Sequence, residues 1–422
     1  MRKVGILLNN ADMENKMKKF VWIACLIYCL NGFGHIIIGT VLEPMVDSYG
    51  IHYRDGGQLI MNQFLGFLGG VMFAPLIVNR LGRRMTIFLA LLSFALSQFV
   101  FSVLPNWNVM LAIAPFGGAG IGIAETIVAS LIIGHLKEKK ATTLVIVEIF
   151  FGVGALAIPV VSAFLIMTGV WSLSFTFVAV FTSIIMLLWL FLSFGELDPI
   201  LKRQTKALTE DGNKPARKRY SKKQLPIIAT GALFFFMYVG TEMVLPNYLP
   251  TIMSKTTNLD ASTLALSITV FWAAMTLGRI SMTGIIDRIG YSKLFIICCI
   301  GQFFSLLMFA YSTSVMFSFI SIFLTGLLMG GIFSIGLLIV NETSKGLEEW
   351  TTSILMAMGG LGGAFLPRIV GELIDRYPVS VVLWSLVLCA FILACLMGVI
   401  FYFRKKAMDV KELQPGKVSN VV

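Results

Sequence analysis

The chain contains twelve long apolar stretches, and this feature limits it to folds that cross a lipid bilayer. A helix needs about 20 apolar residues to cross roughly 30 Å of hydrocarbon, and its backbone polar groups must be bonded internally. The stretches lie at residues 20–46, 58–78, 85–104, 108–134, 142–168, 172–194, 225–252, 262–286, 292–312, 314–341, 348–376 and 379–403. The sequence therefore predicts an all-α membrane protein with twelve transmembrane helices.

The composition supports this interpretation and excludes several other classes. Hydrophobic residues make up 57% of the chain and charged residues 13%, about half the charged share of a soluble domain. No phosphate-binding glycine loop, metal-ligand spacing or nucleophilic triad is present. We therefore expect no enzyme, no nucleic-acid partner, no metal and no cofactor beyond a proton gradient.

Lysine and arginine residues concentrate in alternate connections, which predicts the topology. They are dense in the N-terminal tail, in the connections after the second and fourth stretches, in the middle segment and in the C-terminal tail. The opposite connections, such as residues 105–108 and 169–171, contain none. Both termini are therefore expected to be cytoplasmic, and the chain to be a multi-pass protein of a bacterial inner (cell) membrane.

The basic middle segment divides the chain into two sets of six stretches. The predicted parts are a cytoplasmic N-terminal tail, an N-terminal six-helix half, a solvated and partly disordered basic linker, a C-terminal six-helix half and a cytoplasmic tail. Their bounds are residues 1–19, 20–194, 195–224, 225–403 and 404–422. This layout is typical of transporters built from two repeats.

One short pattern occurs once in each half. Residues 79–84 read Asn-Arg-Leu-Gly-Arg-Arg, and residues 284–290 read Gly-Ile-Ile-Asp-Arg-Ile-Gly. Both follow the second stretch of their half. Glycine permits a tight turn, and a carboxylate and a guanidinium form a pair that can break, which suits a gate. The simpler alternative is a loop that only sets topology. The gate residues predicted here are Arg80, Arg84, Asp287 and Arg288.

These patterns resemble motif A of the major facilitator superfamily, G-x-x-x-D-R-x-G-R-R. The first copy departs from it, with Pro75 in place of the leading glycine and Asn79 in place of the aspartate. Other stretches resemble the fucose/galactose/glucose:proton symporter branch, and within it the bacterial glucose/mannose:proton symporters. They are residues 63–67 with Pro75, 120–126, 148–155 with Pro159, 240–250, 271–279 and 362–371. The resemblance implies the major facilitator fold, with twelve transmembrane helices in two six-helix halves.

Among the acidic residues within the apolar stretches, where a charge costs roughly 2.5–3.5 kcal/mol on insertion scales, three are candidates for proton coupling: Glu125, Glu242 and Glu148. Glu125 is near the middle of its stretch, and the resemblance places a functional glutamate there. Glu242 precedes Pro246 and Pro250, which predict a discontinuous helix beside it. Glu148 lies nearer one end. We interpret all three as proton-coupling candidates, with structural hydrogen bonding as the alternative for each.

Candidates for solute binding are polar or aromatic residues inside the stretches, because sugars present hydroxyls and flat apolar faces. They are Gln63, Asn247, Trp272, Glu242 and His35, although a lone histidine is more often a packing residue. Arg279 is expected to gate or to pair with a carboxylate such as Glu148, and Glu148 could also pair with Arg84. On the sugar pattern, Thr40 replaces an aspartate of the fucose transporters, and Glu43 has no counterpart.

The leading hypothesis is a monomeric secondary transporter in membrane lipid that carries a small-molecule substrate. It would be a proton-coupled symporter that transports a small neutral solute, with a hexose as the first candidate, by alternating access. One alternative is a proton-driven efflux antiporter of lipophilic drugs. Antiporters of the superfamily carry G-P-x-x-G-G late in the fifth span, whereas residues 154–160 read Gly-Ala-Leu-Ala-Ile-Pro-Val, and the missing Gly-Gly disfavours efflux. A remote alternative is a non-transporting membrane sensor.

Overall fold

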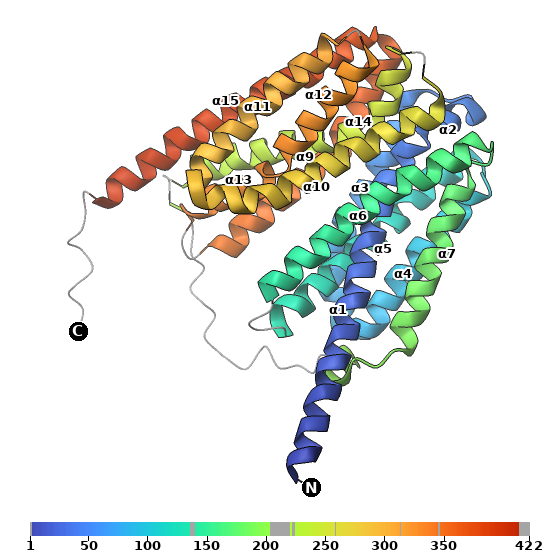
Figure 1. Ribbon diagram of the computed structural model, residues 1–422, viewed down its shortest axis with the longest axis vertical. Coiled ribbons are helices and arrows are strands. Elements are labelled where there is room, and N and C mark those ends of the chain that lie inside the picture. Colours follow the sequence, from blue (N-terminus) through green and yellow to red (C-terminus); the bar gives the residue numbers. More distant parts are fainter. Residues whose placement is uncertain are drawn as a thin grey trace. The chain divides into compact units, whose positions relative to one another are not determined.

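The chain folds into long helices, which a computed structural model describes for residues 2–135, 140–202, 220–221, 224–257, 259–312, 314–344 and 347–412 (Figure 1). Side chains are described within these ranges except at residues 2–17, 133–135, 140–142, 144–145, 196, 202, 283–284, 287, 348–350 and 407–412. Twelve of the described helices are long and apolar enough to cross a membrane. The prediction of an all-α protein with twelve spans is thereby confirmed.

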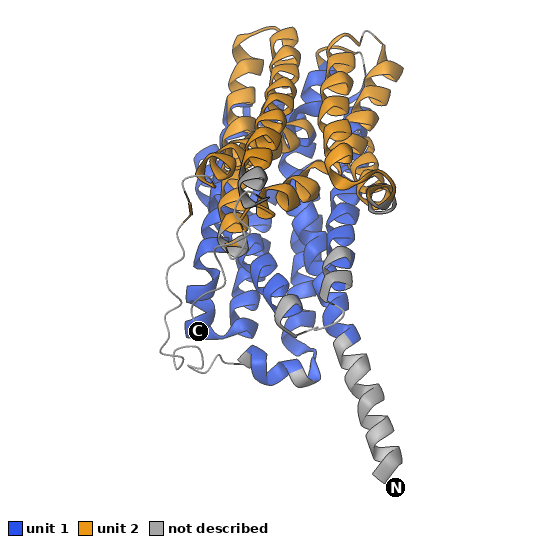
Figure 2. Cartoon of the chain, turned by 90° about the vertical axis from the view of Figure 1, so that its left-hand side faces the viewer, with its two compact units in different colours: residues 1–211, 246–254, 259–269 blue, residues 212–245, 255–258, 270–422 orange. Residues whose placement is uncertain are grey.

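The chain divides into two compact units, coloured separately in Figure 2. Unit 1 comprises residues 1–211, 246–254 and 259–269, and unit 2 comprises residues 212–245, 255–258 and 270–422. The predicted halves put residues 246–254 and 259–269 with the second six spans. In the structure these ends of two spans cluster with unit 1 instead.

Unit 1 is built on helices that pack lengthwise, with α3 along α5, α1 along α6, and α4 along both α5 and α7. Their bounds are α1 Arg2–Thr40, α2 Leu42–Tyr49, α3 Tyr53–Leu81, α4 Arg83–Ser102, α5 Trp107–His135, α6 Lys140–Met167 and α7 Leu173–Phe191. After α7 come a 3-10 turn, η2 Gly195–Leu197, and α8 Asp198–Lys202. Residues 195–202, at the start of the predicted linker, are therefore helical.

Unit 2 contains the remaining helices, and α11 packs along both α12 and α15. The bounds are α9 Leu225–Ser254, α10 Ala261–Ile289, α11 Tyr291–Ala310, α12 Val315–Met329, α13 Ile332–Asn341, α14 Glu348–Arg376 and α15 Val379–Glu412. The α9 and α10 ends at residues 246–254 and 261–269 belong to unit 1.

Two spans differ from the sequence prediction in their continuity. Pro246 and Pro250 were expected to interrupt their helix, yet α9 runs unbroken for 30 residues. Each proline removes one backbone hydrogen-bond donor from the helix. Proline is tolerated inside membrane helices because neighbouring helices and side chains satisfy the carbonyl groups that it frees. The stretch at 314–341 was expected to be continuous, but it breaks at Gly330 and Gly331 into α12 and α13.

The two halves repeat with one constant spacing of 208 positions, seen first in glycine pairs. Gly82 and Gly290, which both have positive φ (79° and 80°), separate the second from the third span of each half. The same spacing relates Gly32 to Gly240, Gly70 to Gly278, Gly118 to Gly326, Gly122 to Gly330, Gly154 to Gly362, and the in-helix prolines Pro159 and Pro367. The repeat therefore extends over the first five spans of each half without insertion.

The spacing also holds for the contacts that these glycines make. A Cβ on Gly118 would overlap the Gln63 carbonyl, and a Cβ on Gly326 would overlap the Phe271 carbonyl. The pairs Gly122 with Phe67 and Gly330 with Met275 correspond in the same way, as do Gly70 with Ala119 and Gly278 with Leu327. The second and fourth spans of each half thus pack backbone to backbone in the same register, as small residues allow in membranes.

Candidate functional site

A polar centre in unit 1 lies where α1 meets α5. Asn31 is fully buried, and its Nδ2 donates a hydrogen bond to Oε2 of Glu125 at 2.9 Å. Asn31 Oδ1 is also buried and has no hydrogen-bond partner among the described residues. Both residues lie near the middle of their spans. The structure therefore combines a carboxylate with an amide that keeps one acceptor unused.

Three polar side chains of α1 share the face that carries Asn31. Tyr28, Asn31 and His35 are three and four positions apart, which places them on one side of a helix. Tyr28 is buried and lies within electrostatic range of both Glu125 and Glu148. Glu148 on α6 is in turn within range of Glu125, although its residue is exposed. Two of the predicted proton-coupling residues are thus in one cluster.

His35 is held by packing as much as by polarity. Its Nδ1 hydrogen-bonds the Asn31 carbonyl one turn earlier at 2.8 Å. Its ring packs edge-on against Phe64, Phe67 and Phe151, with centroids 5.1–5.6 Å away. This environment resembles that of an aromatic core residue.

The two amides predicted to bind solute also lie in unit 1. Gln63 is buried on α3, and its Nε2 donates to the Gly34 carbonyl of α1 at 2.6 Å. Asn247 is buried at the end of α9, where a Cβ on Gly39 would overlap it. Gln63 therefore links α3 to α1 by a hydrogen bond. Asn247 packs against Gly39, where any larger residue would overlap it.

A second polar centre lies within unit 2 and contains Glu242, Arg279 and Trp272, which the sequence also predicts as functional residues. Arg279 on α10 lies beside Glu242 on α9, with 3.5 Å between Nη2 and Oε1. The Glu242 side chain is 7% exposed and that of Arg279 is 33% exposed. Trp272 is buried two turns earlier on α10. The prediction that Arg279 pairs with a carboxylate is confirmed, with Glu242 as the partner instead of the example Glu148.

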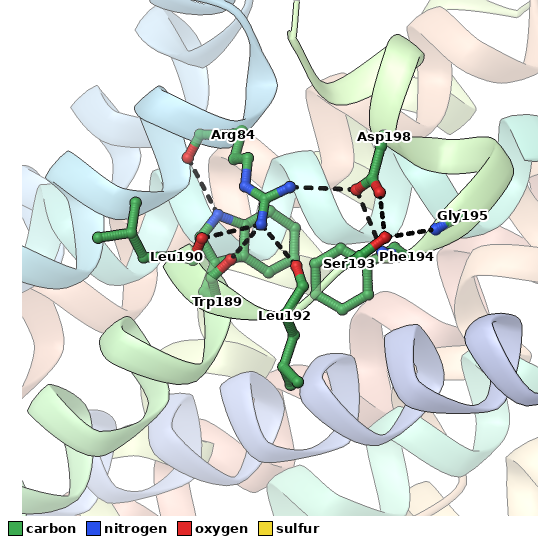
Figure 3. A network of polar contacts seen from close by, with 8 residues as sticks. All are labelled: Arg84, Trp189, Leu190, Leu192, Ser193, Phe194, Gly195 and Asp198. Atoms are coloured by element: carbon green, nitrogen blue, oxygen red, sulfur yellow. Dashed lines mark hydrogen bonds and ion pairs between the residues drawn. The ribbon is translucent and has the colours of Figure 1, made fainter.

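Arg84, which the sequence predicts as a gate residue, lies at the start of α4 and makes a network of polar contacts (Figure 3). Its Nη1 bonds Asp198 Oδ1 at 3.1 Å, and its Nη2 donates to the carbonyls of Trp189, Leu190 and Leu192. The guanidinium also lies over the Phe194 ring, 5.8 Å from its centroid. Arg84 therefore caps the last turn of α7 and fixes α8, and its partner is Asp198 rather than Glu148.

Asp198 lies outside the spans, at the start of α8. Burial raises its pKa, but hydrogen bonds from Ser193 and the Phe194 N–H, together with the Arg84 charge, lower it by more, so that the net pKa is lowered. Ser193 and Asp198 are adjacent in Figure 3, next to the Gly195 N–H. The carboxylate is thus held in its charged form at neutral pH.

Unit 2 has a similar cluster at the start of α11, with the arginine on the other helix. Arg404 near the end of α15 bonds Ser292 Oγ, Tyr291 Oη and Glu342 Oε2 at 2.7–2.9 Å. Tyr291 also donates to Glu342 at 2.6 Å. In each unit a guanidinium therefore ties the first turn of the third span to the end of the sixth.

The other predicted gate residues lie at the surface or outside the described side chains. Arg80 and Arg288 are exposed, at equivalent positions of the repeat. The Asp287 side chain lies outside the described residues. The gate assignment of these three residues remains a prediction.

Sequence reasoning missed Tyr28 and Asp198. Tyr28 could have been found from helical spacing, since it is three positions before Asn31. Asp198 had no such signal, because it lies in a segment that composition describes as linker. Its role depends on a contact between residues 114 positions apart.

These features define a multi-pass membrane protein with polar centres buried between its helices. The sequence model of the Major Facilitator Superfamily matches residues 24–253 and again residues 232–419. The chain therefore belongs to the Major Facilitator Superfamily, a family of membrane transporters and not of enzymes.

Relatives within the superfamily transport several kinds of solute, to judge by their names. The chain is 26% identical over 340 residues to the glucose/mannose transporter GlcP of Bacillus subtilis, covering 81% of this chain and 84% of that protein. The crystal structure of a D-xylose-proton symporter matches with a TM-score of 0.76 at 14% identity, over 90% of this chain and 96% of the other. The nucleoside transporter NupG matches with a TM-score of 0.70 at 14% identity, over 92% and 99%. These structural matches support the fold alone.

Proposed function

We propose that the chain is a proton-coupled symporter of a small neutral solute, with a hexose as the first candidate, and that Glu125 carries the proton. The observation that carries this proposal is the contact of Asn31 with Glu125 inside the bilayer span. A carboxyl at this depth that neighbours an amide and a second carboxylate, Glu148, has reason to exchange a proton.

Asn31 can couple protonation of Glu125 to solute binding, because one side chain would contact both groups. Its Nδ2 contacts the carboxylate, while Oδ1 is left to accept a hydrogen bond from a solute hydroxyl. Solute binding and protonation of Glu125 then act on one amide, so each changes the affinity for the other. Gln63 and His35 line the same part of unit 1 and remain candidates for solute contact.

The name of the relative GlcP supports a hexose. Two other relatives are named as niacin transporters, one at 25% identity over 37% of this chain and one at 22% over 78%. We retain the hexose because the GlcP match combines the higher identity with coverage of most of both chains.

Uptake into proteoliposomes tests this function directly. With an alkaline interior, one proton per solute predicts about tenfold accumulation of labelled glucose for each pH unit. An uncoupler should abolish the accumulation but leave exchange. Extrusion of lipophilic cations under the same gradient, without glucose uptake, would instead support the efflux antiporter.

We also propose that both termini and the basic linker are cytoplasmic, in a bacterial cell membrane. The support is the distribution of lysine and arginine between alternate connections. Labelling of a single cysteine at position 210 tests the proposal, in a background without the six native cysteines. Reaction with an impermeant external reagent in intact cells would contradict it.

A further inference from the structure

Arg279 lies on the interior face of α10, three residues before the end of its apolar span Ala261–Met282. It continues a stripe formed by Trp272, Met275 and Met282, of which all three are buried. Leu277 and Ile280, on other faces of the helix, are exposed as lipid-facing residues are. A charged side chain inside a span faces the bundle interior or a water-filled cavity. The exposed third of Arg279 therefore belongs to the interior.

The guanidinium of Arg279 uses few of its five donors. Within the described part of the chain, it contacts only Glu242 Oε1 at 3.5 Å and the Met275 sulfur at 3.8 Å, both through Nη2. Arg84, by contrast, binds one carboxylate and three carbonyls. The planar fork of Arg279 is thus free to bind a carboxylate in the bidentate manner that arginine favours.

Two further features lie near Arg279: a break in a neighbouring span and the hydroxyl group of Tyr238. A Cβ on Gly330 would lie 2.8 Å from the Arg279 backbone nitrogen, so the break between α12 and α13 adjoins this residue. Tyr238 donates to the Met329 carbonyl at the break, at 2.9 Å, and lies within electrostatic range of Glu242 and Arg279. Discontinuous helices with charged neighbours are how transporters of this architecture form binding sites.

We propose that unit 2 contains a carboxylate-binding site centred on Arg279, which extends the solutes from neutral hexoses to sugar acids such as hexuronates. The solute carboxylate displaces Glu242 Oε1 from its 3.5 Å contact with Arg279 Nη2 and takes both outer nitrogens of the guanidinium. The inference rests on the proposed function only in taking the solute to be hexose-like.

Equilibrium binding to the purified full chain tests the site without any need for a proton gradient. The probes are glucuronate, its neutral methyl ester and glucose, measured by thermal shift and calorimetry. We expect glucuronate to bind at least about tenfold more tightly than its methyl ester, since the ester keeps the ring but loses the charge. Equal affinity for the acid and the ester would overturn the proposal.

Variants assign the effect to Arg279. The double variant Glu242→Gln/Arg279→Gln leaves no uncompensated charge and should fold, yet lose the preference for glucuronate. Glu242→Gln alone removes the competing carboxylate and should tighten glucuronate binding. Arg376→Gln, an exposed arginine that also pairs with a glutamate, is the matched control and should change nothing.

The outcomes separate this site from the proposed transport. Retained glucuronate preference in the double variant would overturn the site, whatever the uptake assays show. Glucuronate binding without proton-driven hexose uptake would support the site and contradict the symport mechanism. Proton-driven hexose uptake without glucuronate binding would support the symport mechanism and contradict the carboxylate site.

Discussion

Asn31 on α1 and Glu125 on α5 are joined by a 2.9 Å hydrogen bond between residues 94 positions apart. Asn31→Ala removes both the donor to Glu125 and the unused acceptor Oδ1. Because the proposed solute contact is a hydrogen bond between neutral groups, which contributes about 0.5–1.5 kcal/mol, we expect solute affinity to fall by about two- to tenfold. Asn62→Ala is the control, since the Asn62 amide on α3 donates to the Leu111 carbonyl of α5 and, within the described part of the chain, makes no hydrogen bond with Asn31 or Glu125. Unchanged affinity in Asn31→Ala would remove Asn31 from the site.

The Glu242–Arg279 pair should be more sensitive to single than to double substitution. Arg279→Gln removes the cation beside the buried Glu242 carboxylate, at a cost below the roughly 3–5 kcal/mol of a fully buried ion pair because the contact is 3.5 Å long and the Arg279 side chain is 33% exposed. We therefore expect Arg279→Gln to lower the unfolding temperature in detergent markedly, and Glu242→Gln/Arg279→Gln to restore most of the loss. Additive losses in the double variant would show that the two side chains do not compensate each other.

Asp198 predicts a pH dependence of stability. Its pKa is lowered in the folded chain, so its contribution is complete above the unfolded value of about 3.9 and is lost as the pH falls through the folded value. We expect Asp198→Asn to be less stable than the parent at pH 7 by about 1 kcal/mol, since such partly exposed pairs contribute little. The difference should shrink below about pH 4. A difference that grows on acidification would contradict this account.

Two buried glutamines make a structural prediction. Gln98 on α4 and Gln302 on α11 are fully buried, and neither amide has a hydrogen-bond partner among the described residues. An unsatisfied buried polar group costs about 1–3 kcal/mol, so Gln98→Leu and Gln302→Leu should raise the unfolding temperature. Gln63→Leu, which loses the bond to Gly34, should lower it. A fall in all three variants would point to ordered water at the first two positions.

The fold was predictable because its main determinant is one-dimensional. A run of about 20 apolar residues must span the bilayer as a helix whatever its tertiary context, and the stretch at 348–376 coincides with α14 Glu348–Arg376. Continuity was less predictable. The prolines of α9 suggested a break that neighbouring helices suppress, whereas the adjacent Gly330 and Gly331 ended α12 without any proline.

The candidate sites were predictable as residues but not as pairs. Depth within a span identified Glu125, Glu242 and Arg279, because a charge there is costly wherever it points. Which groups meet depends on helix rotation and register, which one sequence does not contain. For that reason Arg84 was matched with Glu148 instead of Asp198, and the unused acceptor of Asn31 could not be foreseen.

The central claim is that Glu125 carries the coupled proton, and Glu125→Gln tests it most directly. Glutamine retains a hydrogen-bonding group beside Asn31 but cannot release a proton, so it imitates the protonated carboxyl permanently. In proteoliposomes the variant should bind solute and exchange labelled for unlabelled hexose at near parental rates, yet show no uphill accumulation under a pH gradient. Accumulation at the parental level would contradict the claim and would make Glu242 the first alternative carrier.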